Sequence, residues 1–539
     1  MWAYRDWVIN GLNADMPFDQ FVTAQLAGDL LPNATIDQRI ATGFQCNAML
    51  DPGVRQESIL DRVNTTGAVF LGLTTGCAQC HSHKTDPLSQ REFYQLYAFF
   101  NDAGITEMQM DGNFYVPPEK AVTTEKQAKA EAKLPTTLVM KQTPQPTHIF
   151  IRGDGANPGE RVEAGFPLFL NTTCGPDSPT AVAGSRTRPP EQKQLTRLDL
   201  AAWLLSPDSP LTARVTVNRI WRRFFGLVET ESDFGMQTPE PLHGELLDYL
   251  VSELRGGTRY LEMNARSAIP HLGSSQPVSE NRLGNHLQTP RSSGWRGLKS
   301  LHRLIVTSAT YRQSSNTRPD FGVVDPSNRL LARQRRIRLE AELIRDVSLA
   351  VGDMLCNKLG GPSVFPYQAD GILKNRATPA AWKMSDGEDR YRRGIYTWVW
   401  RLTPHPDLPL FDAPDGVSAC TQRVRSNVPV QALTLLNDPS FVEAARALAI
   451  QIVRSSAKSG VERITLLTRT CLSRDPSTRE LKLLQKLIEN QRQTFTENQD
   501  EAVQVSGDSV PPDCDAAELA AWVVASRVLM NLDEFITRE

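Results

Sequence analysis

The spacing of its apolar residues constrains the fold of this chain more than any other feature. Residues 91–102 (REFYQLYAFFND) carry apolar side chains three and four positions apart, at Phe93, Leu96, Tyr97 and Phe100. This spacing puts them on one side of a helix. The same period recurs in residues 338–355 and 438–453, and the latter begins with Asp438 and Pro439, a favourable helix start. We therefore predict a mainly α, multi-helical fold.

One region departs from the helical period and predicts a small β-rich segment near residues 137–170. Runs of β-branched and apolar residues at 137–139 and 149–151 are broken by proline and glycine, which is typical of two or three short strands. The triplet Arg152-Gly153-Asp154 follows the second run and matches the cell-adhesion tripeptide. A glycine between polar residues after a strand is typical of a plain turn, and we interpret the triplet as one.

A chain of 539 residues is too long for one ordinary core, so we expect more than one domain. The pattern predicts a helical domain at 1–103, then a linker with the small β-rich segment at 104–194. A second helical domain follows at 195–539. Within it, residues 256–293 are polar, rich in Ser, Gly, Asn and Arg, and without a period, which predicts a mobile insertion.

The charge balance and the hydropathy exclude several classes of protein. With 59 basic and 61 acidic residues, the chain carries no overall electrostatic footprint for nucleic acid. No apolar run reaches the roughly 18 residues that span a bilayer, so we expect no transmembrane segment. The N-terminal residues lack the basic start, apolar run and small-residue site of a signal peptide. Because the helical pattern begins at residue 2, we expect the recorded start to be internal to a longer protein.

The residues that can carry chemistry concentrate at 76–87 (GCAQCHSHKTDP). Among the eight cysteines of the chain, Cys77 and Cys80 form a close pair, and His81 follows directly. Two thiols three residues apart can add to the two vinyl groups of one porphyrin, and the adjacent histidine then lies under the iron as an axial ligand. The pattern predicts covalent binding of haem c through Cys77, Cys80 and His81, with His81 as the metal ligand.

The same residues leave three other interpretations open. His83 or Asp86 could join Cys77 and Cys80 in a mixed metal site, although a structural zinc site commonly uses a second Cys-x-x-Cys pair, which this chain lacks. The two cysteines could form a thiol redox pair, but the expected strand-to-helix context is not evident. The thiols could also have a purely structural role.

A low-spin electron-transfer haem needs a second axial ligand. His83 is too close in sequence to His81 to reach the opposite face of the same haem. The remaining candidates are Met108, Met110, His148, His243 and His302. Without such a ligand the iron would be five-coordinate and open to small ligands.

The second half of the chain contains charged residues but no recognisable catalytic motif. Two acids and two bases fall within about two helical turns, at Arg338, Glu342, Arg345 and Asp346. They fit a solvated, salt-bridged face, or a polar site in which Glu342 or Asp346 acts as acid or base. His302 lies near Ser308 and Thr310 without forming a nucleophile motif, and neither a Gly-rich phosphate loop nor a His-Glu-x-x-His motif occurs. The sequence does not identify an enzyme.

The blocks around the Cys-His cluster resemble a known family. These blocks are YRDWVINGLNADMPFDQFVTAQLAGDLLP, ATGF and DRVNTTGAVFLGLTTGCAQCHSHKTDPLSQREFYQLYAFFN. They resemble the planctomycete cytochrome-C-type domain, PSCyt. In the second half, LTARVTVNRIWRRFFG, DFGMQTPEPLHGELLDYL, SLHRLIVTSATYRQSS, RSNVPVQALTLLNDPSFVEAARALA and NLDEFITRE resemble its companion, the planctomycete PSD domain.

The resemblance implies a c-type-cytochrome-like protein of the cell envelope or periplasm, although both domains are of uncharacterised function. We hypothesise that Cys77, Cys80 and His81 hold one haem for electron transfer with a redox partner protein. The helical second half would be a scaffold or docking domain. The alternatives are a non-haem binding or scaffold protein with a structural Cys/His metal site, and an envelope hydrolase that acts on complex glycans.

Overall fold

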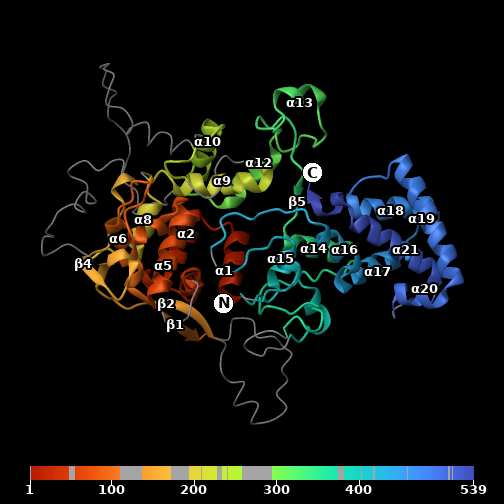
Figure 1. The fold of residues 1–539 in the computed structure, drawn as a ribbon, viewed down its shortest axis with the longest axis horizontal. Helices are drawn as coiled ribbons and strands as arrows, with labels where there is room; N and C mark the ends of the chain where they lie inside the picture. The colour runs from red at the N-terminus through yellow and green to blue at the C-terminus, as the bar shows by residue number, and fades with distance from the viewer. Residues whose placement is uncertain are drawn as a thin grey trace, which may run out of the picture. The chain divides into compact units, whose positions relative to one another are not determined.

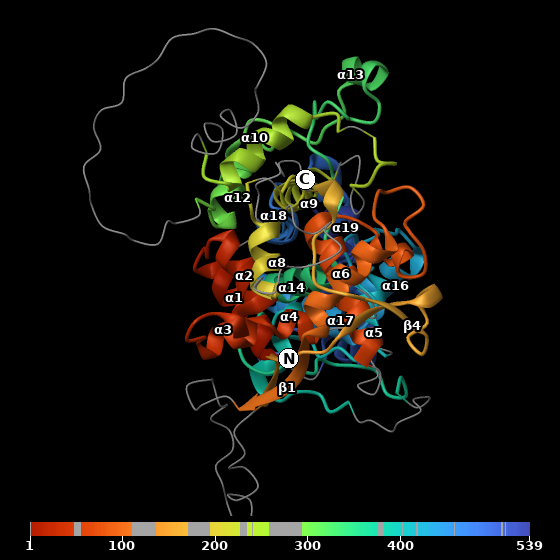
Figure 2. The same cartoon turned by 90° about the vertical axis from the view of Figure 1, so that its left-hand side faces the viewer.

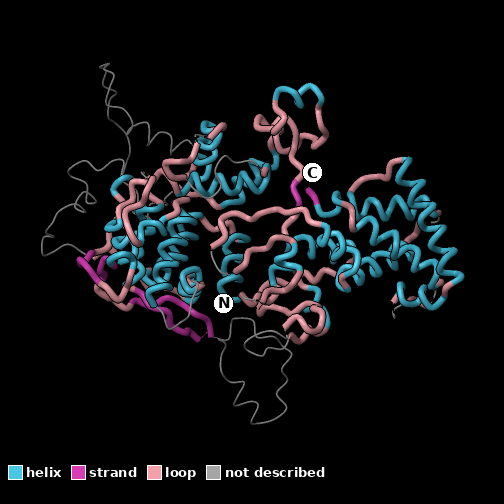
Figure 3. The backbone as a smooth tube through the Cα atoms, in the orientation of Figure 1, coloured by secondary structure: helices cyan, strands magenta, loops and turns pink. Residues whose placement is uncertain are grey.

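The computed structural model describes residues 2–47, 55–109, 136–170, 194–207, 209–226, 234–239, 241–257, 294–373, 382–401, 403–416, 419–457, 459–507, 510–512 and 514–538. Helices dominate these residues (Figure 3), which confirms the predicted mainly α fold. The chain divides into two compact units, unit 1 at residues 1–334 and unit 2 at residues 335–539. The three domain ranges drawn from the sequence pattern stay predictions. Apart from Gly256 and Gly257, the insertion predicted at 256–293 lies outside the described residues.

The helices of unit 1 are short to medium in length (Figures 1 and 2). They are α1 (Trp2–Asn13), α2 (Phe18–Ala27), α3 (Ile36–Ala41), α4 (Gly43–Cys46), α5 (Arg55–Thr66), α6 (Gln90–Asn101), α8 (Arg197–Leu204), α9 (Thr212–Phe225), α10 (Gly244–Leu254), α12 (Leu298–Thr307) and α13 (Pro319–Val324). A capping box starts α6, because the Ser89 hydroxyl accepts from the Glu92 N–H at 3.2 Å and the Glu92 carboxylate accepts from the Ser89 N–H at 2.8 Å. The predicted apolar stripe of α6 is buried, at Phe93, Leu96, Tyr97 and Phe100.

One hydrophobic core joins helices from both ends of unit 1. Leu26 of α2 belongs to the same cluster of buried side chains as Leu200 of α8 and Leu250 of α10. The ring of Phe18 also lies against Trp295, with centroids 5.4 Å apart. The helices that follow residue 194 therefore complete the core of the helices that precede residue 102.

The described residues of unit 1 form two antiparallel strand pairs. β1 (Ala103–Gln109) pairs with β2 (Thr136–Gln142), and β3 (Thr147–Phe150) pairs with β4 (Pro158–Val162). Three of these strands lie in the segment predicted to be β-rich, but the sequence pattern does not predict β1. Its residues, AGITEMQ, have weak strand propensity, so pairing with β2 is what makes this segment a strand. The Arg152-Gly153-Asp154 triplet lies in the connection between β3 and β4, as expected for a turn.

Unit 2 contains a second core. Its elements are β5 (Ile337–Arg338), α14 (Ala341–Val351), α15 (Asp407–Leu410), α16 (Pro429–Asn437), α17 (Pro439–Arg454), α18 (Gly460–Leu472), α19 (Thr478–Glu497), α20 (Gln499–Ser506), α21 (Ala516–Met530) and β6 (Thr537–Arg538). The predicted start of α17 is confirmed, because the Asp438 carboxylate caps it by accepting from the Ser440 N–H at 2.8 Å. The long helix α21 is apolar on most sides and packs at the centre of this core with Leu448 and Leu467.

The amphipathic helix predicted at the start of unit 2 differs from its sequence pattern. Arg338 pairs with Thr537 in the β5–β6 ladder, and α14 begins only at Ala341. The apolar spacing of residues 338–355 predicts a buried stripe at Leu339, Leu343, Val347 and Val351. The buried face is rotated from this stripe, since Ile344 is 0% exposed whereas Leu343 is 39% exposed. Pairing with the distant β6 sets the start of α14, and such pairing leaves no local sequence signal.

Across the described ranges, no helix combines the length and the apolar character that crossing a bilayer requires.

Candidate functional site

The Cys-His loop, which comprises residues 76–87, follows an unusual helix end. α5 runs into a π-helical turn (Gly67–Leu71) that stops at Gly72, whose φ of 62° is left-handed. The 3-10 helix Thr75–Gln79 comes next, and Cys80 is its C-terminal cap. Because a 3-10 helix has about three residues per turn, Cys77 and Cys80 lie on the same side. Ala78 is 0% exposed and faces the core, while both thiols are exposed and unbonded to each other.

Two elements hold the second cysteine in place. Gly153, between β3 and β4, packs so closely that a Cβ atom there would lie 2.6 Å from the Cys80 sulfur. On the other side, the Gln79 carbonyl accepts from Tyr94 Oη at 3.1 Å and from Gln90 Nε2 at 3.0 Å, both from α6. Burial raises the pKa of Tyr94 to about 12, so its hydroxyl remains a donor at neutral pH.

The exposed His81 ring has a defined tautomer. Its Nδ1 atom lies 2.7 Å from the Ser82 carbonyl oxygen. A carbonyl only accepts, so Nδ1 carries the hydrogen and Nε2 of the neutral ring keeps its lone pair. A histidine that donates Nδ1–H to a backbone carbonyl is the form in which Nε2 binds a metal. His81 is therefore prepared to act as a ligand.

The neighbouring His83 serves the loop itself. Its side chain is 8% exposed, and Nδ1 accepts from the Asp86 N–H at 2.9 Å. The buried Asp86 carboxylate in turn accepts from the Met236 N–H at 2.8 Å. These bonds use Nδ1 of His83 and one carboxylate oxygen of Asp86, whereas the buried Nε2 of His83 has no hydrogen-bond partner among the described residues. Over the described part of the chain, no three His, Cys, Asp or Glu side chains gather so that they could hold a metal ion.

Residues far along the chain brace the segment that leads into the Cys-His loop. Arg219 of α9 donates to the carbonyls of Val69, at 2.6 Å, and Ala68, in the π-helical turn. The Phe234 N–H donates to the Gly72 carbonyl at 2.6 Å. Arg219 and the segment that begins at Phe234 are residues that sequence reasoning missed. The available signal was Arg219 among the apolar residues of VNRIWRRFFG, because an arginine in such a segment indicates a buried guanidinium with carbonyl partners.

The predicted distal-ligand candidates lie in different surroundings. Met108 packs on the small cluster around Trp7, and His243 Nε2 lies 2.9 Å from the Arg329 carbonyl. The ring of His302 lies 5.5 Å from that of Phe224, and burial lowers its pKa. Met110 lies outside the described residues.

His148 differs from these because it lies on β3, which leads into the turn at Gly153. Phe150 of the same strand contacts Tyr94 with ring centroids 5.1 Å apart. The strand is thus adjacent to the Cys-His loop, although the distal ligand stays a prediction.

The charged residues singled out in the second half bind separate partners. Glu342 accepts two hydrogen bonds from Arg423, at 2.7 and 3.0 Å. Asp346 is buried and accepts from Arg393 Nε at 2.8 Å and from a backbone N–H. Arg345 donates to a backbone carbonyl, and Arg338 pairs with Asp412. Arg338 and Asp346 therefore belong to internal contacts, which differs from a uniformly solvated face.

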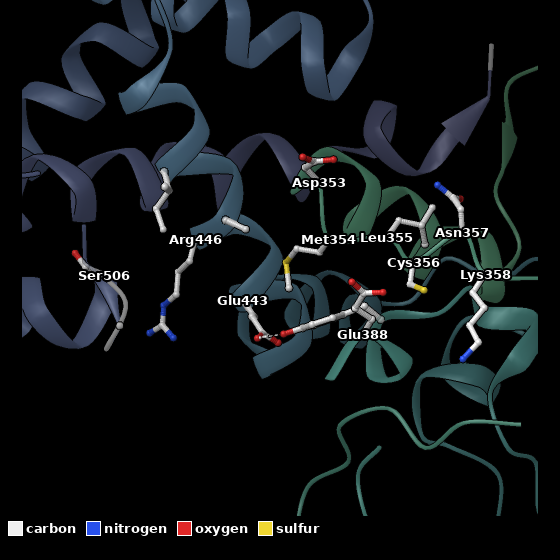
Figure 4. A pocket seen from close by; sticks show the side chains of 14 residues that line it. Asp353, Met354, Leu355, Cys356, Asn357, Lys358, Glu388, Glu443, Arg446 and Ser506 are labelled. Atoms are coloured by element: carbon white, nitrogen blue, oxygen red, sulfur yellow. Dashed lines mark hydrogen bonds between the residues drawn. The ribbon is translucent and has the colours of Figure 1, made fainter. Parts of the chain in front are cut away.

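A pocket of about 830 Å³ lies elsewhere in unit 2 (Figure 4). It is bordered by the loop Asp353–Lys358, by residues Glu388 and Tyr391, by one face of α17 and by the C-terminal end of α20. Its lining does not include Glu342 or Asp346. Sequence reasoning did not identify this pocket, because its walls come from four separate segments.

Comparison with known proteins gives two family matches. The family model PSD1, described as a protein of unknown function (DUF1553), matches residues 196–262 and 274–488, more than half of the chain. The model PSCyt2, described as a protein of unknown function (DUF1549), matches residues 1–104. The resemblance drawn from the sequence blocks is thereby confirmed. No curated protein and no solved structure matches significantly.

Proposed function

Because the chain belongs to the PSD1 family and carries a PSCyt2 domain at residues 1–104, we propose that it is a c-type-cytochrome-like protein. In this proposal Cys77 and Cys80 attach one haem c covalently, and His81 binds its iron, for electron transfer. The observation that supports it most is the combination of two exposed thiols on one side of a 3-10 helix with an exposed histidine in the ligating tautomer. The PSCyt2 name suggests a cytochrome-like family.

The residues of the loop have distinct roles in the proposal. Cys77 and Cys80 would hold the haem through thioether bonds, each of which would form by addition of one S–H across one vinyl group, with the sulfur on one vinyl carbon and the hydrogen on the other. His81 Nε2 offers its lone pair while the Ser82 carbonyl holds Nδ1–H. Gly153 leaves space beside the Cys80 sulfur that any side chain would fill. Haem c, when bound, supplies a one-electron redox centre.

The remaining parts of the proposal follow from attachment chemistry. Attachment at a Cys-x-x-Cys-His motif takes place after export, so the proposed location is the periplasm or cell envelope. Electron transfer needs a redox partner protein, and the helical unit 2 is proposed as a scaffold or docking domain. The hydrolase hypothesis for complex glycans stays a prediction.

Covalent haem content tests the proposal directly. The full chain is produced with an export signal in cells competent for cytochrome c maturation, and haem per chain is measured from a pyridine haemochrome spectrum. We expect about one haem per chain, no attachment in the Cys77→Ala/Cys80→Ala variant, and a perturbed absorption spectrum in His81→Ala. Cys420→Ala, which removes another exposed thiol, is the matched control and keeps full haem content.

A folded wild-type chain without covalent haem would contradict the proposal. Metal analysis of that haem-free chain then tests the alternative of a structural Cys/His metal site. A stoichiometric metal that is lost in the double cysteine variant would support that alternative.

A further inference from the structure

The pocket of unit 2 has a preformed shape. One face of α17 provides its floor with side chains spaced for a single helix face, at Glu443, Arg446, Ala447 and Ile450. Its volume of about 830 Å³ falls in the range of roughly 300–1,000 Å³ that small-molecule sites occupy. Gly352 allows the loop wall to approach α17, because a Cβ atom there would lie 2.9 Å from the Ala444 carbonyl oxygen.

Neighbouring groups fix the orientation of two charged side chains in the pocket. Glu443 Oε1 accepts from Tyr391 Oη and from Arg390 Nη2, both at 2.6 Å. Within the part of the chain that the structure describes, these contacts leave Oε2 of Glu443 as a free acceptor. Arg446 donates from Nε and Nη2 to the carbonyls of Val505 and Gln504, at 2.8 and 2.7 Å, which caps the end of α20. With respect to the described residues, Nη1 of Arg446 is left as a free donor.

Groups of both charge signs surround this pair. Figure 4 shows Arg446 and Lys358 toward opposite ends, with Glu443 and Glu388 between them. Glu388 and Asp353 are exposed and have no side-chain partner among the described residues. Lys358 lies 3.4 Å from the Asp389 carboxylate. A phosphate or carboxylate ligand would meet three carboxylates beside the two cations, and a polyamine would meet the two cations beside the carboxylates, so a ligand of a single charge sign meets repulsion in either case.

Hydroxyl groups satisfy this mixture because each one both donates and accepts. We propose that the pocket binds a neutral, hydroxyl-rich ligand, the chemistry of a sugar. Ligand hydroxyls donate to Glu443 and Glu388 and accept from Arg446. The C–H face of the sugar ring lies against the apolar lining, which includes Met354 and Ile450. The proposal goes beyond haem binding and is independent of it, since every residue involved belongs to unit 2.

Cys356 in the pocket lining provides a direct readout. The full chain is treated with iodoacetamide, and the alkylation rate at each cysteine is followed by peptide mass spectrometry. Cys420, which is exposed in the same unit and outside the pocket lining, is the internal reference. Burial raises the pKa of Cys471 to about 12, so its thiol reacts slowly and does not interfere.

Glucose, galactose and N-acetylglucosamine are the probes. Each is added up to about 100 mM, a concentration at which binding with a millimolar dissociation constant is detected. We expect at least one to slow alkylation of Cys356 by about tenfold at ten times its dissociation constant, with no change at Cys420. Inorganic phosphate and spermidine, as charged probes, leave both rates unchanged. Protection of Cys356 by either charged probe, or by none of the sugars, would overturn the proposal.

Two glutamine variants test the assigned side chains. Glu388→Gln and Glu443→Gln each weaken protection by the active sugar by at least about tenfold. Glu501→Gln, an exposed carboxylate of α20 outside the pocket lining, is the matched control and keeps the wild-type protection. Because Glu388 has no side-chain partner among the described residues, its replacement leaves the fold intact. Unchanged protection in Glu388→Gln and Glu443→Gln would contradict the proposed site.

Discussion

We expect the stability of unit 1 to depend on the buried ion pair between Arg197 and Asp29, because this pair joins the two segments that match the family models. Arg197 opens α8 within the PSD1 match, and Asp29 follows α2 within the PSCyt2 match. Two parallel hydrogen bonds join them, from Nη1 to Oδ1 at 2.9 Å and from Nη2 to Oδ2 at 2.7 Å. Both side chains are almost fully covered, with 2% and 4% exposure.

Replacing Arg197 with methionine removes one charge and leaves its partner buried. The Asp29 carboxylate then has no cation, and the Leu26 carbonyl loses a donor that lies 2.9 Å away. Breaking a buried ion pair by removing one partner costs about 3–5 kcal/mol. We therefore expect Arg197→Met to lower the free energy of unfolding of unit 1 by about 4 kcal/mol. The double variant with Asp29→Leu recovers most of this loss, because an apolar replacement of both partners is often neutral.

Urea-dependent hydrogen exchange is the assay, because peptides from α2 and α8 report the opening of unit 1 separately from unit 2. Arg214→Met is the matched control. Its pair with Asp248 is exposed, at 42% and 55%, and should contribute less than about 1 kcal/mol. If Arg197→Met costs no more than Arg214→Met, the inference that this pair joins the two segments is refuted.

Four further predictions concern unit 1. Gly153→Ala places a Cβ atom against the Cys80 sulfur at a residue whose φ is 77°, so we expect a lower thermal midpoint and lower haem content. Gly460→Ala is the control and should be tolerated, because no atom lies within 4 Å of a Cβ at Gly460. Arg219→Met leaves two carbonyls of the π-helical turn without a donor, and we expect faster amide exchange in residues 68–80 at a cost of about 2 kcal/mol; unchanged exchange would argue against the brace. Burial lowers the pKa of His302, so the stability it contributes is present above its ordinary pKa of 6.5 and is lost as the pH falls below that value. The free energy of unfolding, measured by chemical denaturation, should therefore fall more between about pH 7 and about pH 5 in the wild type than in His302→Phe. A fragment of residues 1–104 lacks the core side chains that follow residue 194, and its circular dichroism should lack the cooperative thermal transition that we expect of the full chain.

Elements with strong local signals were predictable from the sequence. α6 carries its apolar side chains at helical spacing and starts at a capping box, and the start of α17 at Asp438 and Pro439 needs no distant partner. β1 and the start of α14 were missed for the opposite reason. β1 is a strand because it pairs with β2, and Arg338 is held out of α14 by pairing with Thr537.

The Cys-His loop divides in the same way. Cys77, Cys80 and His81 are recognisable because attachment chemistry requires them at fixed spacing within five residues. Their support comes from residues that no local pattern connects to them: Arg219, Met236 and Gly153. The pocket of unit 2 lacks a sequence signal altogether, since α17 and α20 contribute residues more than fifty positions apart.

The sequence by itself therefore determined the mainly helical character, the family and the candidate haem-binding residues, because helical periodicity and ligand spacing act over a few residues. The tertiary structure decided which segments share a core, how the Cys-His loop is braced and where a pocket forms. These features depend on burial and hydrogen bonds between residues that are distant in the chain, such as Arg197 with Asp29 and Asp86 with Met236. Such contacts become visible only when the chain has folded.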